Sequence, residues 1–321
     1  MGSKRDYELK PLFLERMQKL LGKEMPAYLE ILKKPIQNSI RCNTLKISPE
    51  ELLSRLRNKG WEIIQPFKNH PEIMIIKTDL APGEIGRSME HLLGYYYVQE
   101  IASMLPILAL KPKPRELVLD LAAAPGSKTS QMAAEMENIG TIIANDVSIG
   151  RLKILASNME RCGATNAILT KKEGIALCKR LKQEGFLFDK ILVDAPCSGE
   201  GTLRSSSATA IMWNPKTIRS LSRLQKGLLT SALEILRPGG EIVYSTCTHA
   251  PEENEEVVDF VLNEFKGIVK VEEIKLPIKC RSGLTTWLDN QYSKQIEKSC
   301  RIYPQDNDTE GFFLAKIRRI K

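Results

Sequence analysis

Short apolar segments alternate with longer segments of helical periodicity over the last two thirds of the chain. Each short segment has the length of a buried strand, and each longer one repeats its apolar residues every three or four positions. The expected strands are 117–121, 141–145, 167–170, 190–193 and 241–245. The helices expected after them are 129–136, 149–162, 175–184, 217–236 and 254–265. This alternation predicts an α/β fold, a parallel sheet with helices on both faces, and residues 312–317 are expected to add a last strand at the sheet edge.

The beginning of the chain has a different pattern. Residues 8–34 have helical spacing, and a strand at 39–45, a helix at 49–59 and a strand at 73–77 are expected after them. Glycines and prolines between residues 82 and 94 then indicate a loop-rich boundary. We therefore expect an N-terminal helix with a small α+β domain over residues 1–90, and a larger Rossmann-like domain over residues 91–321.

Composition and charge narrow the class of protein. The 321 residues are 42% hydrophobic and 27% charged, which excludes a disordered or fibrous chain. No apolar run approaches the roughly 18 residues of a membrane span, and residues 1–6 lack the apolar core of a signal peptide. We therefore expect a cytoplasmic protein without membrane association; the oligomeric state stays open and a monomer is compatible with the sequence. The net charge of +8 favours an anionic partner.

The cysteines and histidines do not form a metal-binding pattern. Seven cysteines are scattered along the chain without a Cys-x-x-Cys pair, and the three histidines are dispersed, so no metal site is expected. Each cysteine is expected to be a buried, inert thiol unless its position indicates otherwise.

The ends of the first two strands indicate a cofactor site. The segment Asp120-Leu-Ala-Ala-Ala-Pro-Gly-Ser-Lys-Thr129 enters a helix, where backbone N–H groups can bind an anionic group. It lacks the glycine spacing of dinucleotide and triphosphate loops, so a cofactor that carries a carboxylate fits at least as well. Asp146 follows the second strand, where an acid commonly binds ribose hydroxyls. Separately these are an ordinary turn and a helix cap; together they indicate a cofactor that contains ribose.

Two further strands end in cysteines. Asp194-Ala-Pro-Cys197 follows the fourth strand and Ser245-Thr-Cys247-Thr follows the fifth. These strands are neighbours in the usual order of such sheets, so both thiols are expected to face one cleft. Either cysteine alone is most simply an apolar filler, but two thiols beside a cofactor loop favour a chemical role.

These motifs resemble those of the RNA cytosine-5 methyltransferases of the Nol1/Nop2/Sun family. The most specific are the Asp120–Thr129 loop, the Asp194-Ala-Pro-Cys segment, and Thr-Cys247-Thr followed by Pro251-Glu-Glu-Asn-Glu255. The resemblance extends over almost the whole chain. Further similar segments are Arg41-Cys-Asn-Thr-Leu-Lys46, Gly94-Tyr-Tyr-Tyr-Val-Gln-Glu-Ile-Ala-Ser103, Arg301-Ile-Tyr-Pro304 and Gly311-Phe-Phe-Leu-Ala315.

The resemblance implies S-adenosylmethionine as cofactor and C5 of cytosine in RNA as the methyl acceptor. It implies that the loop holds the methionine end of the cofactor, Asp146 the ribose and Glu173 the adenine, with Asp194 also bordering the cofactor. The loop residues are Ala122, Ala123, Ala124, Pro125, Gly126, Ser127 and Lys128. Aspartate is more usual at position 173, and the commoner cysteine and glycine are replaced at positions 122 and 127.

The chemistry explains why thiols are needed. C5 of cytosine is a poor nucleophile, and a thiolate that adds to C6 makes it able to attack a methyl group. By the resemblance, Cys247 is the nucleophile and Cys197 assists product release. Asp194 is expected to hydrogen-bond the N3/N4 edge of the base, and Lys128 to support it.

The RNA substrate remains the most open question. The resemblance to compact archaeal-type enzymes favours tRNA, with rRNA as the alternative and a non-catalytic RNA-binding assembly factor as a more distant one. A methyltransferase for a small molecule or protein would not need two thiols. The N-terminal region resembles the family's RNA-binding domain. Four basic residues on one helical face are interpreted as phosphate contacts or as a solvated face: Lys216, Arg219, Arg223 and Lys226.

Overall fold

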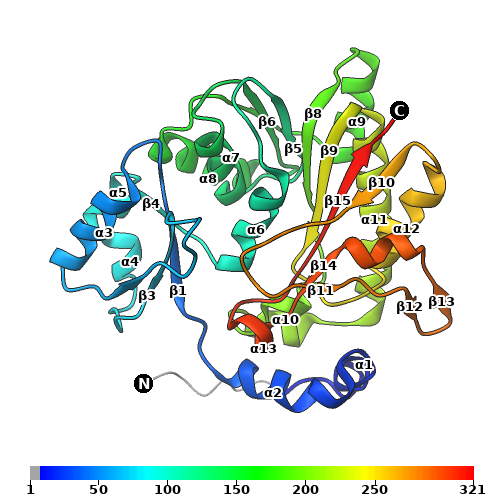
Figure 1. Cartoon of the computed structure of the whole chain (residues 1–321), viewed down its shortest axis with the longest axis horizontal. Helices are drawn as coiled ribbons and strands as arrows, with labels where there is room; N and C mark the ends of the chain where they lie inside the picture. The colour runs from blue at the N-terminus through cyan, green and yellow to red at the C-terminus, as the bar shows by residue number, and fades with distance from the viewer. Residues whose placement is uncertain (1–7) are drawn as a thin grey trace.

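A computed structural model describes residues 8–321; the predictions that concern residues 1–7, including the signal-peptide argument, lie outside the described residues. A nine-stranded sheet forms the centre of the molecule (Figure 1), with strand order β11-β14-β15-β9-β8-β5-β6-β7 and β10 paired to β15. Its strands are β5 (Leu117–Asp120), β6 (Thr141–Asn145), β7 (Ala167–Thr170), β8 (Phe188–Asp194), β9 (Leu236–Thr246), β10 (Val269–Glu272), β11 (Arg281–Ser282), β14 (Cys300–Ile302) and β15 (Phe312–Arg319). The five strands from β5 to β9 are parallel, as predicted.

Helices cover both faces of this sheet. One face packs against α6 (Ile101–Leu110), α7 (Ser127–Glu135) and α8 (Ile149–Cys162). The other face packs against α9 (Gly174–Gln183), α11 (Pro215–Glu234) and α12 (Glu255–Glu264). Consecutive strand residues alternate between the two cores: Leu119 faces one and Val118 the other. The prediction of an α/β fold with a separate, smaller N-terminal domain is confirmed.

The small domain is a four-stranded antiparallel sheet of order β2-β3-β1-β4. Its elements are β1 (Asn38–Cys42), α3 (Pro49–Asn58), β2 (Ile63–Ile64), β3 (Ile73–Ile76), α4 (Glu84–Arg87), α5 (Met89–Leu92) and β4 (Tyr96–Val98). Ser48 caps α3 by accepting a hydrogen bond from the Glu51 amide. Strand β4 was not predicted; it places Tyr96 and Tyr97 in buried positions, so these two rings pack rather than face solvent.

The first helices pack beneath the larger domain, away from the small one (Figure 1). They are α1 (Pro11–Leu21), a 3₁₀ turn η1 (Gly22–Glu24) and α2 (Met25–Lys33). Phe13, Met17 and Tyr28 enter a core with Trp213 and Tyr303 of the larger domain. This N-terminal pair of helices therefore stabilises the large domain, although in the sequence the small domain separates the helix pair from the large domain.

The remaining elements connect and edge the larger domain. They are η2 (Glu200–Thr202), α10 (Ser207–Met212), β12 (Thr286–Trp287), β13 (Asn290–Gln291), η3 (Lys294–Lys298) and α13 (Pro304–Asn307).

Two predictions were wrong. Strand β15 is internal, because β9 pairs with it on one side and β14 and β10 on the other. Cys280 and Cys300 form a disulfide instead of remaining free thiols. No helix within residues 8–321 is long and apolar enough to cross a membrane.

Candidate active site

The sheet register brings the two cysteine-bearing loops together. Strands β8 and β9 pair in parallel with Asp194 opposite Ser245, so the residues that follow them leave the sheet side by side. The Sγ atoms of Cys197 and Cys247 lie 3.2 Å apart. The loops are also joined by a bond from the Gly201 amide to the Cys247 carbonyl oxygen, 2.9 Å. The thiols thus meet as the expected strand order predicts.

The short separation of the thiols affects how they ionise. The hydrogen bond with Cys247 raises the pKa of Cys197 well above its usual value, and burial and the charge of Cys247 act in the same direction. The contact and the burial therefore both favour the neutral thiol of Cys197.

Asp194 and Lys128 form an ion pair beside the thiols. Lys128 Nζ lies 2.8 Å from Asp194 Oδ2, and Ser245 Oγ donates to Asp194 Oδ1 at 2.7 Å. Lys128 also donates to Ser103 Oγ at 3.0 Å and lies over the ring of Phe312. These contacts hold the Asp194 carboxylate in a defined orientation.

A cavity of about 380 Å³ opens in front of these groups. Cys247, Asp194 and Lys128 line it from the larger domain, and Ser39 of β1 lines it from the small domain. Glu100 also reaches this cavity, and burial, together with the charge of Glu310, raises its pKa to about 7. The volume is within the range of small-molecule sites. A planar base that entered it would meet groups from both domains.

The cofactor loop lies at the start of α7, and its residues fit an anionic, ribose-containing group. Gly126 has φ +106°, and a Cβ there would lie 2.8 Å from Leu155 Cδ1, so glycine is needed for the close packing. The first helical N–H groups have no partners within the helix and can bind a carboxylate. Burial raises the pKa of Asp120 to about 7, and its Oδ1 has no hydrogen-bond partner among the described residues.

Asp146 is tied to the same loop. Its Oδ1 accepts from the Ser148 amide at 2.9 Å, and its Oδ2 pairs with Arg151, 3.2 Å away. Arg151 in turn donates to the Ala124 carbonyl oxygen at 2.5 Å. The acid after β6 and the loop after β5 are thus joined into one site. Among the described residues no three His, Cys, Asp or Glu side chains are grouped for a metal ion.

Two family profiles together match nearly the whole chain. The profile described as 16S rRNA methyltransferase RsmB/F matches residues 107–318. The profile of the N-terminal domain of 16S rRNA methyltransferase RsmF matches residues 9–101. The chain belongs to the RsmB/F family.

Individual relatives agree with this membership. A tRNA (cytosine(49)-C(5))-methyltransferase of Pyrococcus abyssi is 44% identical over 95% of both chains. Ribosomal RNA small subunit methyltransferase F of Vibrio campbellii is 39% identical; the match covers 96% of this chain but 63% of the longer Vibrio protein. A solved methyltransferase homologue from Pyrococcus horikoshii superposes with a TM-score of 0.85 at 37% identity, covering 98% and 96% of the two chains. NSun6 from the same organism, solved with SFG, gives a TM-score of 0.80 at 26% identity over 97% and 98%.

Membership of the RsmB/F family settles the class of enzyme. The protein is an S-adenosylmethionine-dependent RNA (cytosine-5) methyltransferase, and the resemblance to the Nol1/Nop2/Sun family is confirmed. Bound at the loop, the cofactor would present its methyl group as the electrophile.

Glu173 was expected to contact the adenine of the cofactor, but in the structure its side chain caps a helix. Its Oε1 accepts from the Ile175 amide at 3.0 Å and its Oε2 from the Ala176 amide at 2.8 Å. It is thus the N-cap of α9, on an exposed position. An adenine contact would require these capping bonds to open, so this role stays a prediction.

The sequence reading missed several residues that hold the site. Ser103 and Ser245, which fix Lys128 and Asp194, stand within the motifs that carried the resemblance, so their place there was the available signal. Gln225 and Glu253 contact the Cys197 loop from α11 and from the segment before α12. The role of Gln225 could not be predicted from the sequence, because the pattern of a helix does not distinguish a buried glutamine from an exposed one.

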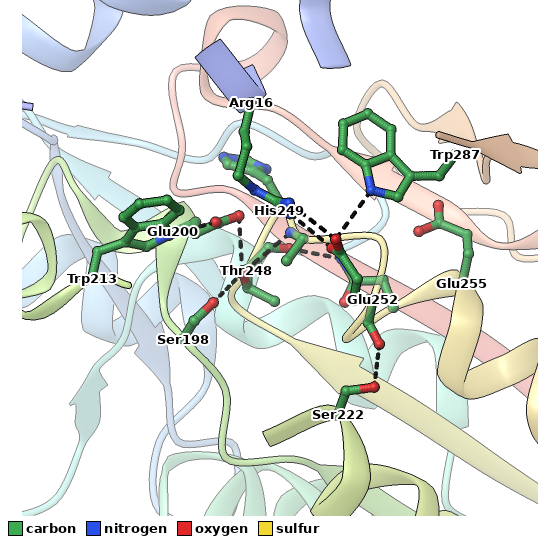
Figure 2. Close-up of polar contacts among 12 residues, drawn as sticks. Arg16, Ser198, Glu200, Trp213, Ser222, Thr248, His249, Glu252, Glu255 and Trp287 are labelled. Atoms are coloured by element: carbon green, nitrogen blue, oxygen red, sulfur yellow. Dashed lines mark hydrogen bonds and ion pairs between the residues drawn. The ribbon is translucent and has the colours of Figure 1, made fainter. Parts of the chain in front are cut away.

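A polar network extends from the cysteine loops to the N-terminal helix α1 (Figure 2). Thr248 Oγ1 contacts Ser198 Oγ at 2.8 Å and donates to Glu200 Oε2 at 3.3 Å, and Glu200 also accepts from the indole of Trp213. Arg16 of α1 binds Glu252 with two bonds of 3.0 and 2.8 Å. The loops that carry Cys197 and Cys247 are thus held by contacts with α1 and Trp213 as well as by contacts with each other.

Proposed function

We propose that the enzyme methylates C5 of cytosine in tRNA, with Cys247 as the nucleophile and Cys197 as the group that serves product release. The observation that carries the mechanism is the 3.2 Å contact between Cys197 and Cys247, of which Cys247 lines the cavity. The tRNA assignment is supported by the Pyrococcus abyssi tRNA enzyme, 95% of whose length this chain matches. The alternative substrate is rRNA, because both family profiles and the Vibrio relative carry rRNA names.

The first half of the reaction uses the charged form of Cys247. Its thiolate adds to C6 of the base, and the electron pair of the C5–C6 bond moves toward N3. S-adenosylmethionine, held by the Asp120–Thr129 loop and Asp146, would supply the methyl group that C5 takes. We expect Asp194, which is paired with Lys128, to accept a hydrogen bond from the exocyclic amine of cytosine. Uracil lacks this donor, so the same carboxylate would favour cytosine.

The second half requires a base for the C5 proton. The contact with Cys247 is the main reason that the pKa of Cys197 is raised. Once the Cys247 sulfur is bonded to C6, its charge is gone, and the Cys197 thiol can release its proton to solvent. The resulting thiolate removes the proton at C5, the C5–C6 double bond re-forms, and the C6–S bond breaks to return the Cys247 thiolate. The original state, with the proton on Cys197, is restored.

RNA is expected to contact both domains. The cavity is lined from both, and Lys216, Arg219 and Arg223 are exposed near the start of α11. We assign these three to phosphate contacts. Lys226 differs from the prediction, since its Nζ pairs with Glu256 Oε1 at 2.7 Å. The expected cytoplasmic location and the possible monomer stay predictions.

The test is methyl transfer from S-adenosylmethionine into unmodified tRNA and, in parallel, into rRNA, followed by mass analysis of the nucleosides. We expect 5-methylcytidine in tRNA only. Its appearance in rRNA only would keep the chemistry and refute the substrate. Cys247→Ala should abolish transfer, and Cys197→Ala should accumulate a covalent protein–RNA species. Free turnover by Cys197→Ala would refute the release role.

A further inference from the structure

The carbonyl before Cys197 and the amide after it are held by a buried pair of side chains. Gln225 Nε2 donates to the Pro196 carbonyl oxygen at 2.8 Å and to Glu253 Oε2 at 2.8 Å. Glu253 Oε2 also accepts from the Ser198 amide at 3.0 Å. Gln225 and Glu253 are both fully buried. The backbone on each side of Cys197 is therefore bonded to one rigid pair.

Cys247 has an equivalent but separate support. Thr246 Oγ1 donates to Asn254 Oδ1 at 2.5 Å, and Asn254 Nδ2 donates to the Thr248 carbonyl oxygen at 3.0 Å. Asn254 is the N-cap residue of α12 and is fully buried, yet its side chain makes no capping bond. Asparagine at this position normally bonds to the helix amides. Here both ends of its amide group bind the neighbours of Cys247 instead.

We infer that Glu253 and Asn254 are positioning residues that fix the two cysteines independently: Glu253 with Gln225 holds Cys197 for product release, and Asn254 holds Cys247 for attack. The inference rests on the proposed function. Each support flanks one cysteine on both sides, so its loss displaces that sulfur more than the other, although the Ser198–Thr248 contact links the two loops. Buried hydrogen bonds are costly to leave unmade, so truncation moves the loop rather than leaving the groups unpaired.

The experiment compares two RNA probes in single-turnover reactions, with detection of the covalent protein–RNA species. One probe is an unmodified tRNA transcript; the other is the same transcript made with 5-fluorocytidine. The fluorine cannot leave as a proton does, so the second probe reports attack and methyl transfer alone. The first probe accumulates the covalent species only when release is slow. Binding of S-adenosylmethionine is measured in every variant to verify the fold.

We expect Gln225→Ala and Glu253→Ala to slow release from the ordinary transcript at least tenfold while they react with the fluorinated transcript at the wild-type rate. Asn254→Ala should lose at least tenfold in reaction with the fluorinated transcript. Glu253→Gln retains an oxygen for the Ser198 amide and should restore release. Ser222→Ala is the matched control: Ser222 lies one turn before Gln225 and is buried, and it donates to the Glu252 carbonyl oxygen at 2.6 Å, not to a residue next to either cysteine.

Three results would overturn the inference. The first is that Gln225→Ala releases product at the wild-type rate. The second is that Gln225→Ala and Asn254→Ala are defective in the same step, either attack or release. The third is that Glu253→Gln has a release defect as large as that of Glu253→Ala. The last result would mean that the carboxylate acts as a base. Failure of the proposed function is separate: Cys197→Ala would then accumulate no covalent species on the ordinary transcript, although the fluorinated one is trapped.

Discussion

The buried ion pair between Arg301 and Glu255 gives a prediction of stability that can be worked from the structure. Arg301 binds the carboxylate with two bonds, Nε to Oε1 at 2.5 Å and Nη2 to Oε2 at 2.6 Å. Both residues are almost completely buried. Arg301 Nη1 also donates to the His249 carbonyl oxygen at 3.0 Å, so the pair supports the loop that follows Cys247.

Arg301→Met keeps most of the side-chain volume but leaves the Glu255 charge buried without its cation. Breaking a buried pair in this way costs about 3–5 kcal/mol. Domains are commonly stable by about 5–15 kcal/mol, so the variant should fold but unfold at much lower denaturant. A second change, Glu255→Gln, removes the unpaired charge while its amide oxygen can still accept from the Leu284 amide. The double variant should therefore regain part of the lost free energy.

The assay is urea denaturation of the wild type, the single variant and the double variant, with equal slopes required for comparison. Arg180→Met is the matched control, because Arg180 pairs with Glu184 at the surface and its loss should cost about 1 kcal/mol or less. A loss within about 1 kcal/mol for Arg301→Met, or a double variant less stable than the single one, would refute the argument.

Three further predictions concern pH, catalysis and RNA binding. Burial raises the pKa of Asp120 to about 7, so the free energy of unfolding should fall as pH rises from about 4 to 7. In urea titrations, Asp120→Asn should flatten the dependence of the free energy of unfolding on pH, whereas Glu15→Gln at the surface should not. An unchanged dependence in Asp120→Asn would contradict the raised pKa of Asp120. Lys128→Met should lower kcat/KM for methyl transfer by about 10²-fold, since it removes the partner that orients the Asp194 carboxylate. Activity within threefold of wild type would exclude this role. Arg219→Gln and Arg223→Gln should each reduce the slope of log K against log salt for RNA binding by about 0.7–0.9, and slopes equal to wild type would place the RNA elsewhere.

The strand ends could be predicted from sequence because a parallel sheet leaves little freedom there. Alternation of strands and helices fixes which ends share one edge, and so Asp120, Asp146, Asp194 and the two thiols were expected together. The register of β8 on β9 then places Asp194 opposite Ser245. These carboxylates and thiols could be located from the positions of their motifs in the sequence, because each motif directly follows a strand.

Contacts between distant segments could not be predicted in this way. The packing of α1 and α2 under the larger domain depends on tertiary contacts such as Phe13 with Trp213, which no local pattern encodes. The pairing of Cys280 with Cys300 likewise follows from strands β11 and β14 lying side by side. Glu173 shows the opposite difficulty: an acid after a strand fits both a cofactor contact and a helix cap, and the structure has the cap.

The Pro251-Glu-Glu-Asn-Glu255 segment served in the sequence only as a marker of resemblance, and the structure supplies a physical reason for each of its four polar residues. Glu252 binds Arg16 of α1, and Glu253 binds the Ser198 amide beside Cys197. Asn254 binds both neighbours of Cys247, and Glu255 binds Arg301 of β14. Four consecutive side chains thus connect four separate parts of the molecule at the back of the site. A single substitution in this segment therefore changes one connection at a time, which is why attack, release and stability should be separable by mutation although the residues are adjacent.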